Sequence, residues 1–373
     1  MLCTRPTDRQ VIGESVPEYE EYAVLHEFVT PAKRALSHGT WDYLMGAAET
    51  ETTYLRNRLA LDAIALRPRV LRDVEKVDTS AHVLGRRLDL PIILAPIGSL
   101  QDLVAGGGAV PARVAERANV LHMLSSASAP GLEAVAAVNE HPKIFQLYVR
   151  GDAAWVDAYV ERVIAHRYIA LALTVDLDYY GRRERDLAKR YKSTARRSAQ
   201  ADHFQARFSW ADVARLRRKF DIPIMLKGIA TAEDGKLALE HGVAGVYVSN
   251  HGGRQLDHGS GAIAVLPEIV DAVRGRAEII VDGGFMRGTD IVKAMALGAN
   301  AVGLGRLQGL ALAAGGEAGL LRMLAVLKDE VTRCLGLLGV TSFAELDGSY
   351  LAAASPLGRA GLDSAFPLLK EGY

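Results

Sequence analysis

The sequence is poor in cysteine, has no excess of charge of either sign and lacks the Cys/His spacing of a metal site. Cys3 and Cys334 are its two cysteines among 373 residues, too few for a disulfide framework, which indicates a reducing compartment. Lys and Arg together number 44, as do Asp and Glu, so no net basic field attracts nucleic acid or anionic lipid. We therefore expect no disulfide scaffold, no nucleic-acid partner and no metal.

Long apolar runs are scarce as well. The first 22 residues lack the basic region and apolar core of a secretory signal, and no stretch approaches the ~20 apolar residues of a membrane-spanning helix. The hydrophobic share of 49% and the charged share of 24% are typical of a globular protein with a sizeable core. These features predict a cytoplasmic protein without a membrane partner.

From about residue 90 onward, short β-branched apolar runs alternate with longer segments of helical periodicity. This alternation favours βα units around a parallel sheet, and eight strands close a (β/α)₈ TIM barrel. The predicted strands are 90–98, 122–126, 143–149, 169–176, 222–228, 245–251, 278–284 and 301–306. The predicted helices include 153–168, 209–220, 231–242, 264–276, 287–299 and a last one with an apolar stripe from Leu320 to Leu335.

The length suits one barrel with extensions. Residues 1–85 are predicted to form an N-terminal helical extension packed on the barrel, with helices over 18–26 and 31–61. Residues 86–350 would form the barrel itself and 351–373 a C-terminal tail. The segment 184–208, rich in Arg, Lys, Ser and Ala, is predicted to be a mobile surface loop.

Polar and glycine residues follow nearly every predicted strand, and the carboxyl ends of barrel strands meet at one mouth. They are Ser125, Ser126, Gln146, Tyr148, Thr174, Asp176, Lys227, the run 249–254, Asp282, Gly283, Gly284, Gly305 and Arg306. Each alone has a plain explanation, since strand ends meet water. Their joint occurrence favours a functional site.

The densest of these clusters is SNHGGRQLD at 249–257. An imidazole accepts a proton at neutral pH and a guanidinium offers a planar fork to a carboxylate, so His251 and Arg254 would place a base beside an anion clamp. In the structural alternative, Gly252 and Gly253 form an ordinary turn and His251 is merely hydrogen-bonded.

Lys227 ends an apolar strand, where a buried ammonium is costly without an anionic or electron-rich neighbour. It could form a Schiff base, contact a phosphate or stabilise a reduced flavin, and the residue type alone does not choose among these roles.

The seventh and eighth predicted strands end in VDGGFMRG (281–288) and GLGR (303–306). Glycine-rich loops at these two places, with a helix N-terminus, form the recurrent phosphate site of such barrels, and Arg287 and Arg306 add positive charge. The alternative is that these glycines serve ordinary βα turns.

Five ordered motifs now carry a resemblance that spans about residues 20–350: FQLY (145–148), LTVD with GRR (173–176 and 181–183), MLKG (225–228), SNHGGRQLD (249–257) and DGGFMRGTD (282–290). Together they resemble the FMN-dependent α-hydroxy acid oxidase and dehydrogenase family, which includes glycolate oxidase, lactate oxidase and mandelate dehydrogenase. The resemblance implies oxidation of an L-2-hydroxy acid to the 2-oxo acid and reoxidation by O₂ or a quinone-like acceptor. Either hydride passes from C2 to flavin N5, or His251 abstracts the C2 proton in a carbanion mechanism. The resemblance also implies a homo-oligomer, because relatives are often tetramers.

The resemblance implies roles for matching residues. His251 would be the active-site base and Asp176 would stabilise its imidazolium. The substrate would be held by Tyr43, Tyr148, Arg183 and Arg254. Lys227 would counter the negative charge of reduced FMN. The rest of FMN would be held by Pro96, Ile97, Gly98, Ser125, Gln146, Thr174, Ser249, Asp282, Gly283, Gly284, Arg287, Gly305 and Arg306.

Two departures from the family pattern bear on these roles. Met286 stands where relatives carry a phosphate-binding arginine, and the loss of one charge-assisted contact would cost about 1.5–3 kcal/mol of FMN affinity. Gly98 matches a position where relatives carry Ala or Gly, and Ala127 and Ala129 occupy a region where glycolate oxidases place a bulky aromatic. The smaller side chains favour a substrate larger than glycolate, aromatic or branched.

Two other readings stay open. A barrel lyase or aldolase would use Lys227 as a Schiff base. A non-catalytic flavin-binding relative would have lost its activity together with the arginine that Met286 replaces.

Overall fold

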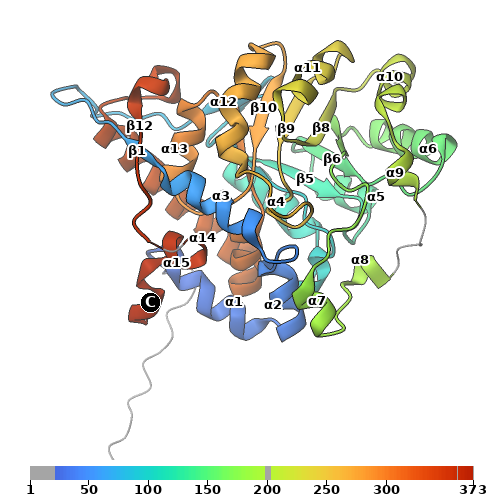
Figure 1. Cartoon of the computed structure of the whole chain (residues 1–373), viewed down its shortest axis with the longest axis horizontal. Helices are drawn as coiled ribbons and strands as arrows, with labels where there is room; N and C mark the ends of the chain where they lie inside the picture. Colours follow the sequence, from blue (N-terminus) through green and yellow to red (C-terminus); the bar gives the residue numbers. More distant parts are fainter. Residues whose placement is uncertain (1–21, 198–202, 359, 373) are drawn as a thin grey trace, which may run out of the picture.

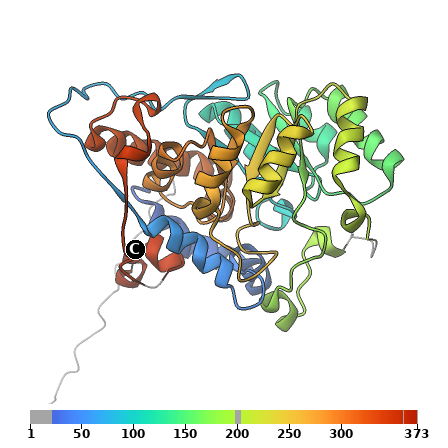
Figure 2. The same ribbon diagram turned by 45° about the horizontal axis from the view of Figure 1, so that its top comes forward.

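The computed structural model describes residues 22–197, 203–358 and 360–372. Eight parallel strands in this part of the chain form a closed barrel in the order β10-β11-β4-β5-β6-β7-β8-β9, with helices around it (Figures 1 and 2). The strands are β4 (Ile92–Leu94), β5 (Leu121–Ser125), β6 (Lys143–Leu147), β7 (Ala170–Thr174), β8 (Ile224–Ile229), β9 (Gly245–Val248), β10 (Glu278–Val281) and β11 (Ala301–Leu304). Each coincides with a predicted strand, so the predicted (β/α)₈ TIM barrel is confirmed.

Helices alternate with these strands along the chain. They are α4 (Ala109–Ala118), α5 (Leu132–Ala136), α6 (Ala153–Ala165), α10 (Trp210–Lys219), α11 (Ala232–Glu240), α12 (Ala262–Val273), α13 (Gly288–Ala296) and α14 (Arg306–Leu338). The five helices predicted with both bounds match α6, α10, α11, α12 and α13 within three residues at each end, whereas α14 begins well before the predicted apolar stripe. Their apolar faces bury against the barrel. Asp152 illustrates the local control of a helix start, because its carboxylate accepts the N–H of Trp155 and caps α6.

The segment before the barrel is mostly helical from residue 22 to residue 62, and it holds short strands and irregular chain from residue 63 to residue 85. It holds η2 (Leu25–Phe28), α1 (Val29–Ala35), α2 (His38–Met45) and α3 (Thr52–Asp62). Of these, α1 packs against α14 and α3 against α12. Residues 18–21 of the predicted first helix lie outside the described residues. The sequence did not indicate β1 (Ile64–Leu66), which pairs with β12 (Leu351–Ala353) and so ties this segment to the C-terminal one.

A second unanticipated element is the hairpin of β2 (Ala81–Val83) and β3 (Arg86–Leu88). Its Val83 and Leu88 side chains are fully buried among residues at the start of barrel strands, including Ile93 and Leu121. The barrel interior is therefore packed at this end. The opposite end, where the strands finish, is the end left for a site.

The C-terminal segment adds α15 (Leu362–Ala365) and η6 (Pro367–Glu371) after β12. The predicted surface loop 184–208 contains α7 (Glu184–Ala188), α8 (Thr194–Arg197) and α9 (Phe204–Arg207), with 198–202 outside the described residues. Its mobility stays a prediction.

Helix α14 corrects one expectation about apolar runs. Within the described residues it is the one helix long and apolar enough to cross a membrane by length and composition, and half of its most apolar window is buried. It packs against α1, α4 and α13, and Gly315 and Gly316 break its helical geometry. These contacts account for its apolar character as that of an outer barrel helix.

A buried ion pair fastens the N-terminal segment to the barrel, and its loss should be costly. Arg58 on α3 contacts Asp290 on α13 at 2.6 Å, with side chains 7% and 1% exposed. We expect Arg58→Met to lower the free energy of unfolding by about 3–5 kcal/mol, because the buried Asp290 loses its ion-pair partner and keeps only the backbone N–H groups of Met286 and Arg287. Urea unfolding with FMN present measures this. Arg333→Met, which removes an exposed pair, is the control, and equal midpoints for the two variants would contradict the assignment.

Candidate active site

Asp176 and Tyr148 flank His251 at the mouth of the barrel. His251 follows β9 with a left-handed φ of 57°, and Gly252 and Gly253 continue that conformation. Its Nδ1 lies 3.1 Å from Asp176 Oδ1 and its Nε2 lies 3.2 Å from Tyr148 Oη. An ionised carboxylate can only accept, so Nδ1 donates to Asp176, and Nε2 accepts from the tyrosine hydroxyl. Nε2, the ring nitrogen that carries no hydrogen, is therefore the atom that can take up a proton.

The charges around this pair reinforce that assignment. Burial lowers the pKa of His251 from its ordinary value, helped by Lys227 and Arg183, whereas Asp176 acts in the opposite direction. Burial also opposes ionisation of Asp176, but His251 and Lys227 outweigh it and hold the pKa of the carboxyl below its usual range. A neutral imidazole beside an ionised carboxylate is the arrangement of a general base and the carboxylate that orients it.

A glycine makes this contact possible. Asp176 follows β7, and the strand between it and His251 is β8, which carries Gly228 with a φ of 118°. A Cβ at Gly228 would lie 2.7 Å from the Asp176 Cβ. A larger residue would push the carboxylate away from His251.

Two arginines and a tyrosine form a group beside His251. Arg254 donates to the carbonyl of Gly46 at 2.8 Å, and its guanidinium carbon lies 4.9 Å from the ring centre of Tyr43. Arg183 is 7% exposed and donates to the Arg254 carbonyl at 3.4 Å. Burial, together with the charge of Arg254, lowers the pKa of Arg183 to about 10. Two adjacent guanidinium groups repel each other, and a bound anion such as a carboxylate would stabilise both.

Lys227 belongs to a separate buried network. Its ammonium donates to Ser249 Oγ at 3.1 Å and lies 3.4 Å from Asp282 Oδ2, and Ser249 Oγ donates to Asp282 Oδ1 at 2.6 Å. Lys227 is 3% exposed. The carboxylate compensates the buried charge, which therefore persists at the floor of the site.

Arg306 forms a third cationic place. Its guanidinium donates to the carbonyls of Gly252 at 2.9 Å and Gly46 at 2.8 Å and lies 4.6 Å from the ring centre of Tyr54. Burial lowers its pKa to about 10. In the part of the chain that is described, no carboxylate pairs with Arg306. Its positive charge beside glycine-rich loops is therefore suited to bind an anion.

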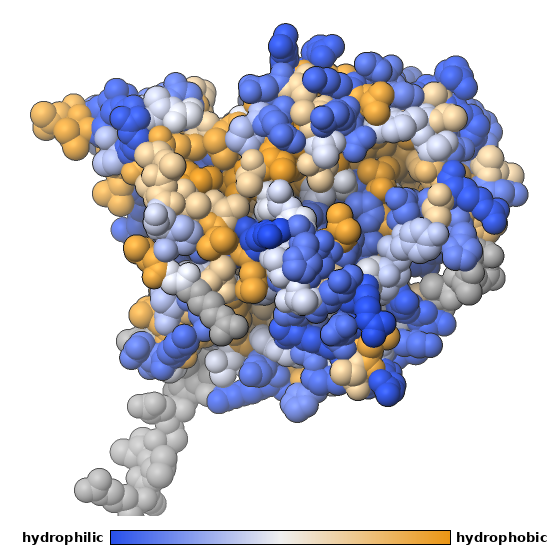
Figure 3. Space-filling view, in the orientation of Figure 1, coloured by the Kyte–Doolittle hydropathy of each residue, from blue (hydrophilic) through white to orange (hydrophobic). Residues whose placement is uncertain are grey.

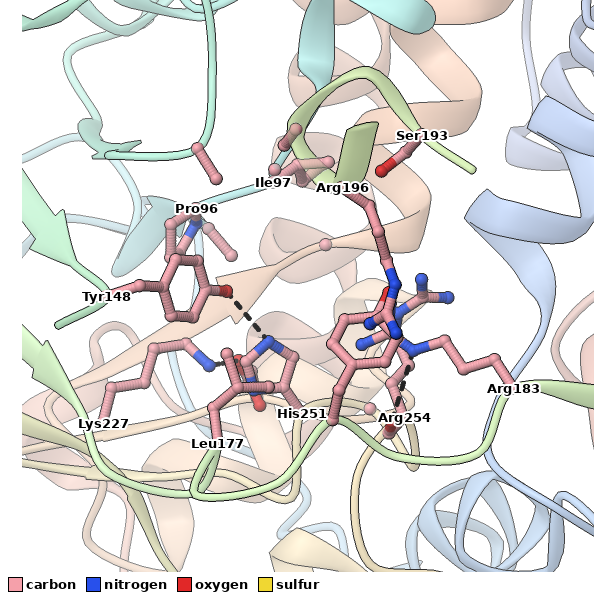
Figure 4. A pocket seen from close by; sticks show the side chains of 18 of the residues that line it. Pro96, Ile97, Tyr148, Leu177, Arg183, Ser193, Arg196, Lys227, His251 and Arg254 are labelled. Atoms are coloured by element: carbon pink, nitrogen blue, oxygen red, sulfur yellow. Dashed lines mark hydrogen bonds and ion pairs between the residues drawn. The ribbon is translucent and has the colours of Figure 1, made fainter. Parts of the chain in front are cut away.

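One cavity of about 990 Å³ joins these groups. In Figure 4, Tyr148 and Lys227 approach His251 from one side, whereas Arg183, Arg196 and Arg254 gather on the other. The cavity is lined by most of the predicted site residues: Tyr43, Pro96, Ile97, Gly98, Tyr148, Arg183, Lys227, His251, Arg254, Asp282, Gly283, Gly284, Gly305 and Arg306.

Five other predicted residues lie outside its lining. Asp176 stands behind His251, and Ser125, Gln146, Thr174 and Ser249 are buried. Gln146 donates to Thr174 Oγ1 at 2.8 Å, while its Oε1 has no partner among the described residues. This oxygen is thus an unsatisfied acceptor just outside the residues that line the cavity.

Arg287 is not brought to the cavity. It is the N-cap residue of α13, and its guanidinium pairs with Glu330 on α14 at 2.6 Å and donates to the Ala365 carbonyl. Its side chain thus holds α14 and the C-terminal segment. Met286, one residue earlier, lines the cavity instead.

Sequence reasoning missed several cavity residues, among them Tyr54, Tyr180 and Arg196. Tyr54 comes from the N-terminal segment, where no motif marked it. Tyr180 adjoins the GRR motif, and its hydroxyl accepts from Arg183, so that motif was the available signal. Arg196 was assigned to the surface loop but lines the cavity.

Known proteins resemble this chain over most of its length. The family model described as FMN-dependent dehydrogenase matches residues 32–353. Glycolate oxidase of Spinacia oleracea is 37% identical over 355 residues, covering 89% of this chain and 96% of that protein. 2-Hydroxyacid oxidase 2 of Rattus norvegicus is 38% identical, covering 86% and 96%. A solved mandelate oxidase variant with (S)-mandelic acid superposes with a TM-score of 0.84 at 36% identity, covering 90% and 100%.

The two-sided contact of His251 predicts its titration. We expect its pKa to lie below the ordinary 6.5, and Asp176→Asn to lower it further, because the charge that favours the imidazolium is removed. NMR of ¹⁵N-histidine-labelled protein across pH measures both values. A pKa above 6.5 in the unsubstituted chain, or one unchanged by Asp176→Asn, would contradict the geometry.

Proposed function

The chain belongs to the family of FMN-dependent dehydrogenases and is an FMN-dependent 2-hydroxy acid oxidase or dehydrogenase, and we propose that it converts an L-2-hydroxy acid larger than glycolate to the 2-oxo acid. One observation carries the proposal: His251, oriented by Asp176, faces a cavity that also holds the Arg183–Arg254 pair. A base and a carboxylate clamp in one cavity are what a 2-hydroxy acid requires.

The residues present fit FMN. Arg306, buried without a carboxylate partner among the described residues, suits its phosphate. Gln146 Oε1 offers an unused hydrogen-bond acceptor, and Lys227 supplies a buried positive charge. Bound FMN supplies the two-electron acceptor that no side chain provides. Gly283 and Gly284, at φ of 102° and 85°, line the cavity, and their lack of a Cβ lets this loop pack closely against Asn57 of α3.

The chain's own residues handle the substrate. Arg183 and Arg254 bind its carboxylate, while Tyr43 supports the clamp through the ring contact with Arg254. His251 takes the proton of the C2 hydroxyl at Nε2, and Asp176 stabilises the imidazolium that results. Tyr148, whose pKa is raised by burial, keeps its proton and would turn its hydrogen bond from His251 Nε2 to the substrate oxygen, which leaves Nε2 to accept the hydroxyl proton.

Small side chains line the place where the substrate's own side chain would lie. Ala127 lines the cavity, and a Cβ added to Gly98 would lie 3.4 Å from the Ala127 Cβ. The solved mandelate oxidase variant is a structure with (S)-mandelic acid, and its similarity to this chain supports a large acid here. Both observations support a substrate larger than glycolate.

The Schiff-base alternative is less well supported. A Schiff-base lysine attacks as the free amine, whereas Lys227 is held as an ammonium by Asp282 and Ser249. A non-catalytic relative would not need the Asp176–His251–Tyr148 arrangement, which is intact.

Acceptor, location and assembly complete the proposal. We propose reoxidation by O₂ or a quinone-like acceptor, a cytoplasmic location and a homotetramer. The face in Figure 3 supports self-association, because apolar residues gather over the part next to β1 and β12. In the loop after β1, Val70 and Leu71 are 79% and 103% exposed, and such side chains suit an interface between copies.

Anaerobic bleaching of the flavin tests the function. L-2-Hydroxy acids of graded size should bleach bound FMN, with higher kcat/KM for acids larger than glycolate. His251→Ala should stay yellow and lose the bleaching by about 10²-fold or more, because no group takes the hydroxyl proton. Unchanged bleaching in His251→Ala would refute the base, and no bleaching by any hydroxy acid would refute the function.

FMN retention tests the place of the phosphate. We expect Met286→Arg to slow FMN release about tenfold or more, because it adds a charged partner to the cavity lining. Arg287→Met is the matched control, since Arg287 points to Glu330 and its loss should leave FMN release unchanged. Dialysis followed by flavin absorbance measures both. Faster release from Arg287→Met, with no change in Met286→Arg, would place the phosphate elsewhere.

A further inference from the structure

A third guanidinium lies beside the two arginines of the carboxylate clamp. The guanidinium carbon of Arg196 is 3.4 Å from the ring centre of Tyr180, and that of Arg183 is 4.0 Å from the same centre. The two carbons are thus no farther apart than the sum of these distances. Figure 4 shows Arg196 extending from α8 toward Arg183 and Arg254.

The segment that carries Arg196 is fixed to the barrel mouth. Thr194 donates from its backbone N–H to Asp102 Oδ2 at 2.9 Å, and Ala195 N–H donates to Ser99 Oγ at 2.8 Å. Ser99 and Asp102 belong to the loop after β4. Since α8 is anchored and Tyr180 stacks on the guanidinium, Arg196 is held in place before any ligand binds.

The clamp region has more positive charge than one carboxylate can balance. Arg196 has no carboxylate within ion-pair distance in the described residues, and the same holds for Arg183 and Arg254. Asp186 interacts electrostatically with all three arginines, and burial raises the pKa of its carboxyl group. A monocarboxylate supplies one negative charge to three guanidinium groups, whereas a diacid supplies two.

Further cations line the same cavity. Arg150, Lys192 and Arg196 line the cavity and are exposed, and its two acidic lining residues among those described are Asp178 and Asp282, the second engaged by Lys227. This exposed part of the cavity therefore favours a substrate whose distal end is anionic.

We propose that the substrate is a 2-hydroxy dicarboxylate, whose C1 carboxylate binds Arg183 and Arg254 and whose distal carboxylate binds Arg196. This inference rests on the proposed function and specifies what the larger substrate side chain carries. Because the guanidinium groups of Arg183 and Arg196 both lie against the Tyr180 ring, the distal carboxylate should be only one or two carbons beyond C2.

Paired substrates test the inference. L-2-Hydroxybutanedioate and its C4 amide have nearly the same shape and differ by the distal charge. With the FMN-loaded enzyme, anaerobic bleaching should favour the diacid over the amide. Arg196→Met should reduce that preference about ten- to hundredfold and change the amide rate far less, because the charge-assisted contact is lost for the diacid alone.

Arg197→Met is the matched control. Arg197 is on the same helix, but it donates to the Lys192 carbonyl and Thr194 Oγ1 and does not line the cavity, so the preference should persist. Binding of butanedioate, which lacks the C2 hydroxyl and so cannot be oxidised to a 2-oxo acid, followed by the flavin absorbance change, gives a second readout and should weaken only in Arg196→Met.

The outcomes separate the two levels of the claim. Equal rates for diacid and amide, or a preference for aromatic monoacids over the diacid, would overturn the dicarboxylate inference alone. Equal loss for both substrates in Arg196→Met would also overturn it and assign Arg196 to the C1 carboxylate or to steering. If no hydroxy acid of any kind bleaches the flavin, the proposed function itself fails.

Discussion

The hydrogen bond between His251 Nδ1 and Asp176 is the constraint on which the rest of the site depends. It fixes which nitrogen of the imidazole carries hydrogen, and it leaves Nε2 as the proton acceptor. The bond spans two strand ends that flank β8, so it exists only because the barrel brings β7 and β9 close and because Gly228 leaves room between them. The closed sheet thereby controls the chemistry of one ring.

The remaining site is organised by unbalanced positive charge. Lys227 has its own carboxylate, but Arg306 and the Arg183–Arg254 pair contact mainly carbonyl oxygens. These positive charges are unfavourable without anionic partners. Binding of a phosphate near Arg306 and of a carboxylate near Arg183 and Arg254 would remove that cost. The neutral base between them then meets a substrate that is already oriented.

Periodicity was sufficient to predict the barrel, and strand-end motifs predicted site residues of which most line the cavity. Both succeeded because buried parallel strands and glycine-rich loops leave strong local signals. The failures have physical reasons. Arg287 and Met286 are adjacent in sequence, and only the start of α13 decides which one faces the cavity. The β2–β3 hairpin is short and owes its stability to burial inside the barrel. Tyr54 and Arg196 reach the cavity through contacts distant in sequence, which no local pattern encodes.

Uptake of FMN by the flavin-free chain tests the central claim, that this mouth of the barrel is a flavin site with a charged floor. We expect titration to saturate at one FMN per chain with the appearance of visible absorbance bands, and we expect Lys227→Met to lower the reduction potential of the bound flavin, because a buried positive charge is removed. No uptake, or a potential that does not change in Lys227→Met, would contradict the claim.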